Sequence, residues 1–120
     1  MKKYLFLDDD RNPKDVTWVN IPRNFLWEVV RSHNEAVEWV EENGFPDVVS
    51  FDHDLADVHY AGDFSKEKTG YDFAKWLVER DLDNHDMPED FEFYVHSMNP
   101  VGAENISNLL QMYKLRRSDK

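Results

Sequence analysis

The segment YLFLDDDR, residues 4–11, decides the fold, because four apolar residues run directly into three aspartates and an arginine. A run that is apolar at every position is typical of a strand buried on both faces, in the middle of a parallel sheet. Ligands bind to such sheets beyond the carboxyl ends of the strands. The segment therefore predicts a central strand at Tyr4–Leu7 and a polar site at the acids that follow it.

Three further strands are predicted downstream, at Phe25–Val30, Asp47–Phe51 and Phe91–Val95. In the last of them apolar residues alternate with more polar ones, which suits an edge strand with one wetter face. The connection between the first two strands, Arg11–Asn24, contains two prolines that argue against a long helix.

Helices are predicted after the second, third and fourth strands. Ser32 and Glu35 fit a capping box at the start of a helix that Gly44 ends. Thr69 is a suitable cap for the next helix, and Pro100 suits the first turn of the last one. This alternation of strands and helices implies a parallel sheet with right-handed crossovers and helices on both faces.

The length of 120 residues is usual for one domain. We therefore expect a single α/β domain over residues 1–120. Its fold should be a doubly wound three-layer sandwich around one parallel sheet, with four strands in the order 2-1-3-4.

Composition excludes several classes of protein. The chain has no cysteine, which rules out disulfides, thiolate metal sites and a cysteine nucleophile. Its start lacks the long apolar stretch of a signal peptide, and it has no run of ~20 apolar residues to span a membrane, so we expect a cytoplasmic protein without a membrane partner. With 25 acidic against 14 basic residues the formal charge is −11, which disfavours binding to duplex nucleic acid.

Polar clusters follow three of the four predicted strands, at Asp8–Arg11, Asp52–Asp54 and His96–Asn99. The carboxyl ends of parallel strands meet at one edge of the sheet, so these clusters should converge where neighbouring connections leave to opposite faces. Simpler interpretations stay open. The aspartates could be turn residues, the histidines could be structural, and Ser97 and Asn99 could be only helix caps.

Carboxylates crowded in one place repel one another unless a cation joins them. Hard divalent ions take oxygen ligands, so Mg²⁺ or Mn²⁺ is the expected cofactor, and the nearby histidines leave Fe²⁺ or Zn²⁺ open. The segment Ser97–Gly102 precedes the N-terminus of the last helix, where free N–H groups and the helix dipole favour anions. An acidic metal side facing an anion-binding side suits a phosphate ester.

The segment YLFLDD, with Asp52 and Ser97 at two later strand ends, resembles the receiver domains of two-component signalling. The resemblance implies a flavodoxin-like receiver fold in which Asp8 and Asp9 bind Mg²⁺. It makes Asp52 the counterpart of the phosphoacceptor and Ser97 the hydroxyl that contacts the phosphate. The chain departs from receivers because it lacks the fifth strand with its preceding lysine, and because a loop with prolines replaces the first helix.

A closer resemblance is to the receiver-like family described as cyclic-phosphate processing. The blocks that carry it are LFLDD with Arg11 and Pro13, DHDL at 52–55, TGYD at 69–72 with Trp76 and Leu77, and HSMNPVG at 96–102. These blocks occur in order over nearly the whole chain. The resemblance implies a receiver-like fold and an activity on a cyclic phosphate.

The resemblance and the residues together predict a metal-dependent hydrolase or phosphodiesterase. Its substrate would be a small ligand that carries a cyclic phosphate, either a nucleotide or an RNA-derived molecule. The predicted metal ligands are Asp8, Asp9, Asp52 and Asp54. The predicted catalytic residues are His53 and His96, as general acid and base, and Asp52. The predicted phosphate-binding residues are Arg11, Ser97, Asn99 and Gly102.

Two alternatives to the enzyme stay open. The first is a non-catalytic protein that binds and sequesters a cyclic or phosphorylated nucleotide in the same pocket. The second is an atypical receiver phosphorylated on Asp52, against which the missing lysine and the inserted His53 and Asp54 count. The polar loop Ala56–Lys68 is longer than usual and bears on substrate specificity.

Overall fold

The computed structural model describes residues 2–22, 26–54 and 69–118. Along the chain the elements are β1 (Tyr4–Leu7), η1 (Pro13–Asp15), β2 (Trp27–Val30), α1 (His33–Asn43), β3 (Val48–Phe51), α2 (Gly70–Asn84), β4 (Glu92–Val95) and α3 (Pro100–Ser118). The loop at residues 56–68, which the sequence predicts to be polar, lies outside the described residues. Of the helices that are described, none is long and apolar enough to cross a membrane.

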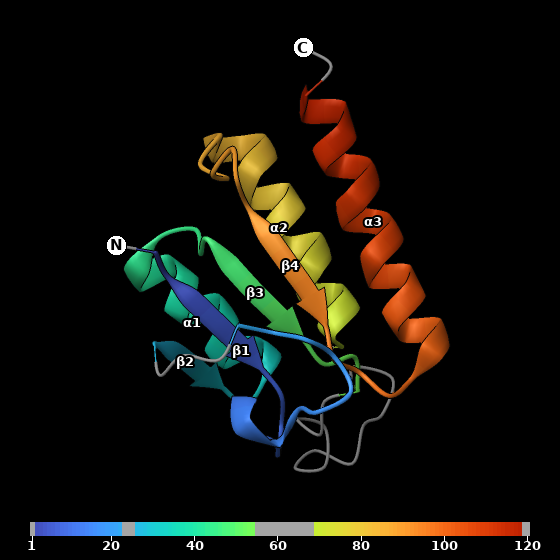
Figure 1. Cartoon of the computed structure of the whole chain (residues 1–120). Helices are drawn as coiled ribbons and strands as arrows, with labels where there is room; N and C mark the ends of the chain where they lie inside the picture. Colours follow the sequence, from blue (N-terminus) through green and yellow to red (C-terminus); the bar gives the residue numbers. More distant parts are fainter. Residues whose placement is uncertain (1, 23–25, 55–68, 119–120) are drawn as a thin grey trace, which may run out of the picture.

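The four strands form one parallel sheet in the order β2-β1-β3-β4, as the sequence predicted, with β4 at an edge (Figure 1). In the register, Leu7 lies beside Phe51, and Phe51 lies beside Val95. The pairing continues one step further, because the amide of Asp52 donates to the carbonyl of Leu7 and the amide of His96 to the carbonyl of Phe51. The first residues after three strands therefore lie side by side.

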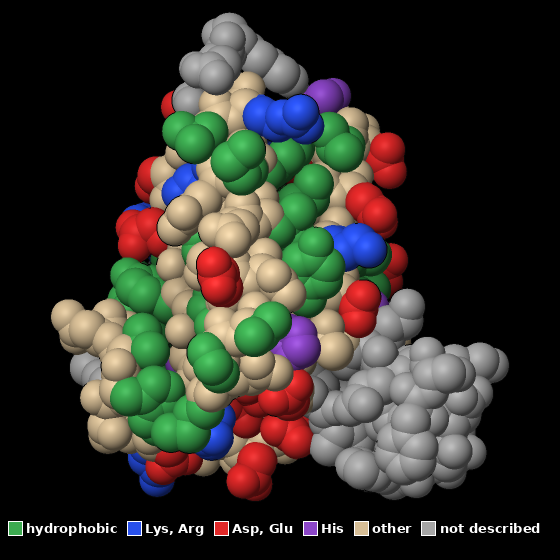
Figure 2. Space-filling view, turned by 90° about the vertical axis from the view of Figure 1, so that its right-hand side faces the viewer, with side chains coloured by type: hydrophobic (Ala, Val, Ile, Leu, Met, Phe, Trp, Pro, Cys, Tyr) green, Lys and Arg blue, Asp and Glu red, His purple; other side chains and the backbone are tan. Residues whose placement is uncertain are grey.

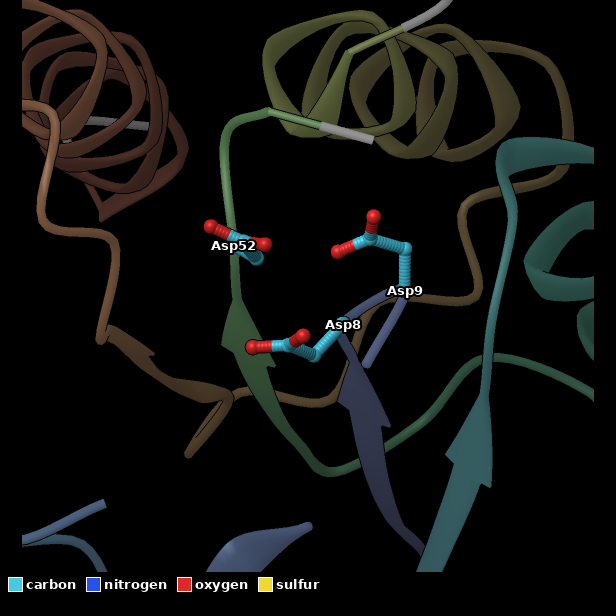
Figure 3. Close-up of side chains that lie close together, drawn as sticks. All are labelled: Asp8, Asp9 and Asp52. Atoms are coloured by element: carbon cyan, nitrogen blue, oxygen red, sulfur yellow. The ribbon is translucent and has the colours of Figure 1, made fainter. Parts of the chain in front are cut away.

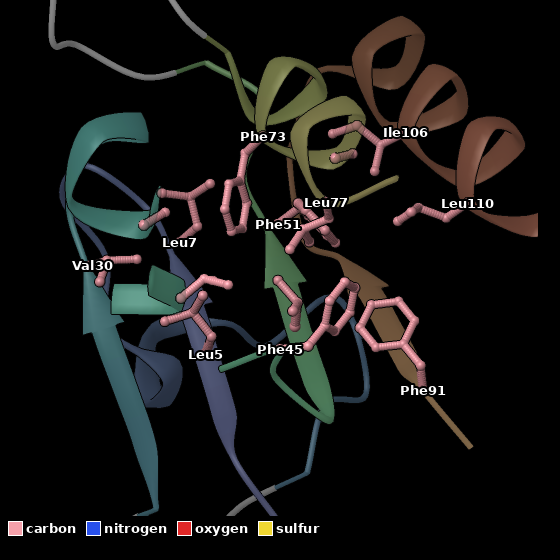
Figure 4. Close-up of a cluster of buried hydrophobic side chains, with 14 of the residues drawn as sticks. Leu5, Leu7, Val30, Phe45, Phe51, Phe73, Leu77, Phe91, Ile106 and Leu110 are labelled. Atoms are coloured by element: carbon pink, nitrogen blue, oxygen red, sulfur yellow. The ribbon is translucent and has the colours of Figure 1, made fainter. Parts of the chain in front are cut away.

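One face of the sheet carries all three α-helices. Leu5 and Leu7 of β1 and Phe51 of β3 pack against Phe73 of α2 and Ile106 of α3 in one fully buried cluster (Figure 4). Burying an apolar side chain of this size contributes roughly 1.5–3 kcal/mol, so this cluster is the main source of stability. The remaining members of the cluster include Val30, Ala36, Val40, Phe45, Val49, Ala74, Leu77, Met87, Phe91 and Leu110.

The other face is covered differently from the sequence-based expectation of α-helices on both faces. In the described residues its third layer is the segment that holds η1, from which Val16 and Ile21 pack against Phe6, Trp27 and Val48. The cause is the handedness of the connections. The chain crosses from β1 to β2 in one direction and then returns across the sheet in the other, so only the first connection lies on this face. Within the described part of that connection the helical segment is η1, which begins at Pro13.

The element boundaries differ slightly from the predicted ones. Strand β2 begins at Trp27 rather than at Phe25, which lies outside the described residues, and Leu26 is 46% exposed. The Ser32 hydroxyl accepts from the amide of Glu35 at 3.1 Å as a capping box requires, but the Glu35 carboxylate accepts from the amide of Arg31 instead of Ser32. The predicted cap of α2 is confirmed.

Candidate metal and phosphate site

Three carboxylates meet at the carboxyl ends of β1 and β3 (Figure 3). One oxygen from each of Asp8, Asp9 and Asp52 lies within 4.8 Å of the others. The sheet register explains this, since Asp8 and Asp52 are the first residues after two neighbouring strands and Asp9 follows directly. At this end of the molecule acidic side chains gather on the surface (Figure 2). The sequence predicted this convergence.

Asp8 is the most firmly held of the three. Its Oδ1 accepts from the amides of Asp10, at 2.9 Å, and Arg11, at 2.8 Å, and its Oδ2 accepts from His96 Nε2 at 3.0 Å. Burial alone would raise the pKa of Asp8, but the hydrogen bonds from His96 and from the two amides lower it to about 2. Asp8 is therefore ionised at neutral pH although it is only 1% exposed.

The pKa values of the two other carboxylates are shifted in the opposite direction. Burial, together with the charge of Asp8, raises the pKa of Asp9, and the same two causes raise the pKa of Asp52 to about 7. Two ionised carboxylates beside a permanently ionised one repel each other, and a cation between them removes that repulsion. Oxygen donors in this number suit a hard ion such as Mg²⁺, which uses one or two carboxylates and fills its other positions with water and phosphate. The donor set therefore fits a divalent cation.

His96 does not lie where a general acid or base would have to be. It is fully buried, and both ring nitrogens are bonded, Nε2 to Asp8 and Nδ1 to the Ser50 hydroxyl at 2.6 Å. The Phe6 ring is stacked on its imidazole, with centroids 4.5 Å apart. In this position His96 supports the site from below, and the predicted proton transfer to a substrate is out of its reach.

His53 is partly buried and contacts Asp54. Its Nδ1 is 2.9 Å from Oδ1 of Asp54, and its side chain is 19% exposed. The ring packs against the first turn of α3 at Gly102, where an added Cβ would lie only 2.3 Å from the ring carbon Cγ. Gly102 is thus needed for close packing of His53. Its amide donates to Oδ1 of Asn99, so the predicted contact of that amide with phosphate is not available in this arrangement.

The remaining predicted residues line one open pocket with the acids. Asn99 caps α3 and also places its amide nitrogen 3.4 Å from both carboxylate oxygens of Asp54. Ser97 accepts from the amide of Asn99. The pocket has a volume of about 570 Å³ and is lined by Asp8, Asp9, Asp10, Arg11, Asp52, Asp54, Ser97, Met98, Asn99 and Pro100.

Arg11 forms the basic wall of this pocket. Its Nη1 is 3.5 Å from Oδ2 of Asp8, its Nη2 contacts the sulfur of Met98, and its guanidinium lies over the ring of Trp18. Trp18 is itself anchored, because its indole N–H donates to the carbonyl of His96 at 2.8 Å. Arg11 is therefore directed toward the acids while a third of its side chain stays exposed, as an anion-binding residue requires.

Comparison with known sequences assigns the chain to a family. The family described as "Cyclic-phosphate processing Receiver domain" matches residues 3–112. The chain belongs to this family. Among curated proteins none matches the sequence. A solved structure described as a response regulator receiver domain protein from Clostridium thermocellum is similar over 98% of each chain, with 18% sequence identity and a TM-score of 0.44.

For this cyclic-phosphate processing receiver domain, the structure shows which predicted residues meet. The acids, Arg11, Ser97 and Asn99 share one pocket, and His96 lies beneath it. His53 and Gly102 pack against each other and are not among the described residues that line the pocket. Trp18 and Ser50 were not among the predicted site residues. Ser50 had a detectable signal, because a polar residue within an otherwise apolar buried strand requires a hydrogen-bond partner. Trp18 had no such signal, since nothing in the sequence of its loop indicates which carbonyl its indole contacts.

The first turn of α2 approaches the site so closely that only glycine fits. The amide of Gly70 donates to the carbonyl of His53 at 2.8 Å, and a Cβ on Gly70 would lie 1.8 Å from the carbonyl oxygen of Asp52. Gly70→Ala should therefore destabilise the domain by ~1–3 kcal/mol in urea unfolding and weaken cation binding, because backbone must move. Alanine is ordinarily the better helix former, so an unchanged or increased stability would contradict this close approach.

Proposed function

We propose that this domain is a metal-dependent phosphodiesterase that hydrolyses a cyclic phosphate of a nucleotide or of an RNA-derived small molecule. The observation that carries the proposal is the meeting of Asp8, Asp9 and Asp52 within one pocket with Arg11 and Ser97. The family description supports a cyclic phosphate as the ligand class. A bare acidic pocket would repel such an anion, whereas one that holds a cation attracts it.

The proposed cation ligands are the three carboxylates, with Asp54 as a further ligand or orienting group. A divalent cation bound there supplies charge neutralisation at the phosphoryl oxygens. Arg11 and Ser97, which line the same pocket, would bind the remaining phosphate oxygens. Asn99 would orient Asp54, to which its amide is already directed.

Hydrolysis adds water across one P–O bond of the ring. The water oxygen joins phosphorus, the ring P–O bond breaks, and the leaving oxygen takes up a proton. Two proton transfers are needed, because the attacking water loses a proton and the leaving oxygen gains one. In an in-line displacement these two oxygens lie on opposite sides of phosphorus, so the two transfers take place at different positions. We assign one of them to His53, oriented by Asp54. The open pocket allows water to serve the other, in place of the buried His96.

A panel of substrates with and without metal tests the proposal. The purified protein is incubated with 2′,3′-cyclic nucleotides, 3′,5′-cyclic nucleotides and cyclic dinucleotides, in Mg²⁺, Mn²⁺ or EDTA, and phosphomonoester products are measured by ³¹P NMR. We expect turnover that EDTA abolishes. We also expect each effective cation to stabilise the fold, by ~2.7 kcal/mol at a hundred times its dissociation constant. An unchanged melting temperature in both metals would contradict a cation site.

Two further measurements separate the alternatives. Tight binding of a cyclic nucleotide without turnover in any metal would indicate a sequestering protein. A mass increase of one phosphoryl group on Asp52 after incubation with a small phosphodonor would indicate a receiver. Two observations count against phosphorylation on Asp52. None of the described residues that line the pocket is a lysine, and Asp52 is only 6% exposed.

A further inference from the structure

A chain of buried polar groups runs beneath the carboxylates. Ser50, in the middle of β3, is fully buried and bonds to Nδ1 of His96, whose Nε2 bonds to Asp8. All three side chains leave the sheet on the face covered by the η1 segment. Burying three polar groups is costly unless every one is bonded, and in this chain each of them is.

The position of the His96 ring is defined by its plane and by which of its edges faces Asp8. The Phe6 ring lies parallel to the imidazole, with 6° between the planes, which fixes the plane of the ring but not which edge faces Asp8. A half-turn about the Cβ–Cγ bond would keep the ring in that plane and would point carbon atoms at both Asp8 and Ser50. The Ser50 hydroxyl, 2.6 Å from Nδ1, therefore adds to Asp8 in favouring one of the two orientations.

The partner atoms determine the direction of the bond to Asp8. Asp8 accepts two amides and the Arg11 guanidinium and is therefore a carboxylate, so His96 must carry a proton on Nε2. A serine hydroxyl both donates and accepts, so Ser50 satisfies Nδ1 with or without a proton there. The result is a carboxylate whose Oδ2 is held in place by a ring that a second residue orients.

We infer that Ser50 and His96 are positioning residues that hold the Asp8 carboxylate in the orientation the cation site requires. This inference rests on the proposed function for the cation, but the orientation of the ring exists in the free protein as well. It is the counterpart of the outer-shell partners that orient ligands at metal sites, where loss of a partner typically costs 10- to 100-fold in metal affinity.

The test compares two buried substitutions on the same strand and face. Ser50→Ala removes the hydroxyl, whereas Val48→Ala removes apolar contacts with Phe6 and leaves the polar chain intact. Mn²⁺ affinity is measured by electron paramagnetic resonance, and the Nε2 proton of His96 is followed by ¹H–¹⁵N NMR in the metal-free protein. We expect ~10- to 100-fold weaker Mn²⁺ binding and loss or broadening of the Nε2 proton signal in Ser50→Ala. We expect Val48→Ala to lower the melting temperature and change neither readout.

Two variants of His96 test whether another donor can replace the ring. His96→Gln keeps an amide donor on a side chain of similar reach, whereas His96→Leu keeps only apolar volume, so Gln should retain more Mn²⁺ affinity than Leu. Equal Mn²⁺ affinity in the native protein and Ser50→Ala, with the Nε2 signal unchanged, would overturn the inference. A different outcome is that the native protein shows the Nε2 signal and Ser50→Ala loses it, while the native protein binds no Mn²⁺. In that case the orientation of the ring by Ser50 stands and the proposed cation-dependent function fails.

Discussion

His53→Ala should lower turnover of the cyclic phosphate by ~100- to 10,000-fold, the usual range for a positioned proton-transfer group. Affinity for the substrate should change much less, because the cation and Arg11 hold the phosphate. The rate of the native enzyme should depend on pH in a bell shape, and the variant should lose one limb of it. The measurement is a pair of pH profiles of kcat and of kcat/KM.

A histidine outside the site is the matched control. His85 caps α2 in the left-handed region, with φ of 54°, and His85→Asn keeps a residue that tolerates this conformation. We expect native turnover from it. His96→Gln should instead act mainly through weaker cation binding, since that ring is buried beneath Asp8. Full turnover in His53→Ala would remove His53 from the mechanism.

Asp52→Asn should change stability in opposite directions with and without a divalent cation. Burial and the charge of Asp8 raise the pKa of Asp52 from 3.8 to about 7 in the folded protein. Between these two values the folded state keeps a proton that the unfolded chain has lost, so stability falls as pH rises through this window. Above pH 7 the full cost of the buried charge is present. Asparagine never ionises, so it removes that cost.

In EDTA at pH 8 the variant should therefore melt at a higher temperature than the native protein, and the difference should vanish near pH 4. With saturating Mg²⁺ or Mn²⁺ the native protein should gain stability and the variant should gain little, because a ligand is missing. Scanning calorimetry across pH, with and without the cation, measures both effects. The control Asp83→Asn changes an exposed acid of α2 and should follow the native protein under all conditions. A destabilised Asp52→Asn in EDTA at pH 8 would contradict the repulsion between the carboxylates.

Much of the fold was readable from local patterns. Strand β1 is apolar at every position because helices cover one of its faces and the η1 segment covers the other, and that pattern is visible without coordinates. The strand ends were less certain, since Phe25 and Leu26 continue the apolar pattern while the ladder begins at Trp27. Backbone pairing determines where a strand begins, and apolarity alone does not report it.

The convergence of the acids also followed from the sequence. In a parallel sheet, residues that directly follow neighbouring strands must lie together, and Asp8, Asp52 and His96 hold that position in β1, β3 and β4. The order of the strands made this prediction possible. It needed no knowledge of which side chains pack over the site.

The two histidines show what only the tertiary structure decided. His53 and His96 are the same residue type in similar polar clusters, and the sequence assigned them the same role. His96 is fully buried because Phe6 stacks on it and Trp18, from a loop 78 residues away, bonds its carbonyl, whereas His53 lies at the edge of α3. Burial depends on which distant segments pack over a side chain. Local sequence therefore placed both histidines directly after strands, and tertiary packing buried one of them beneath Asp8 and set the other against α3.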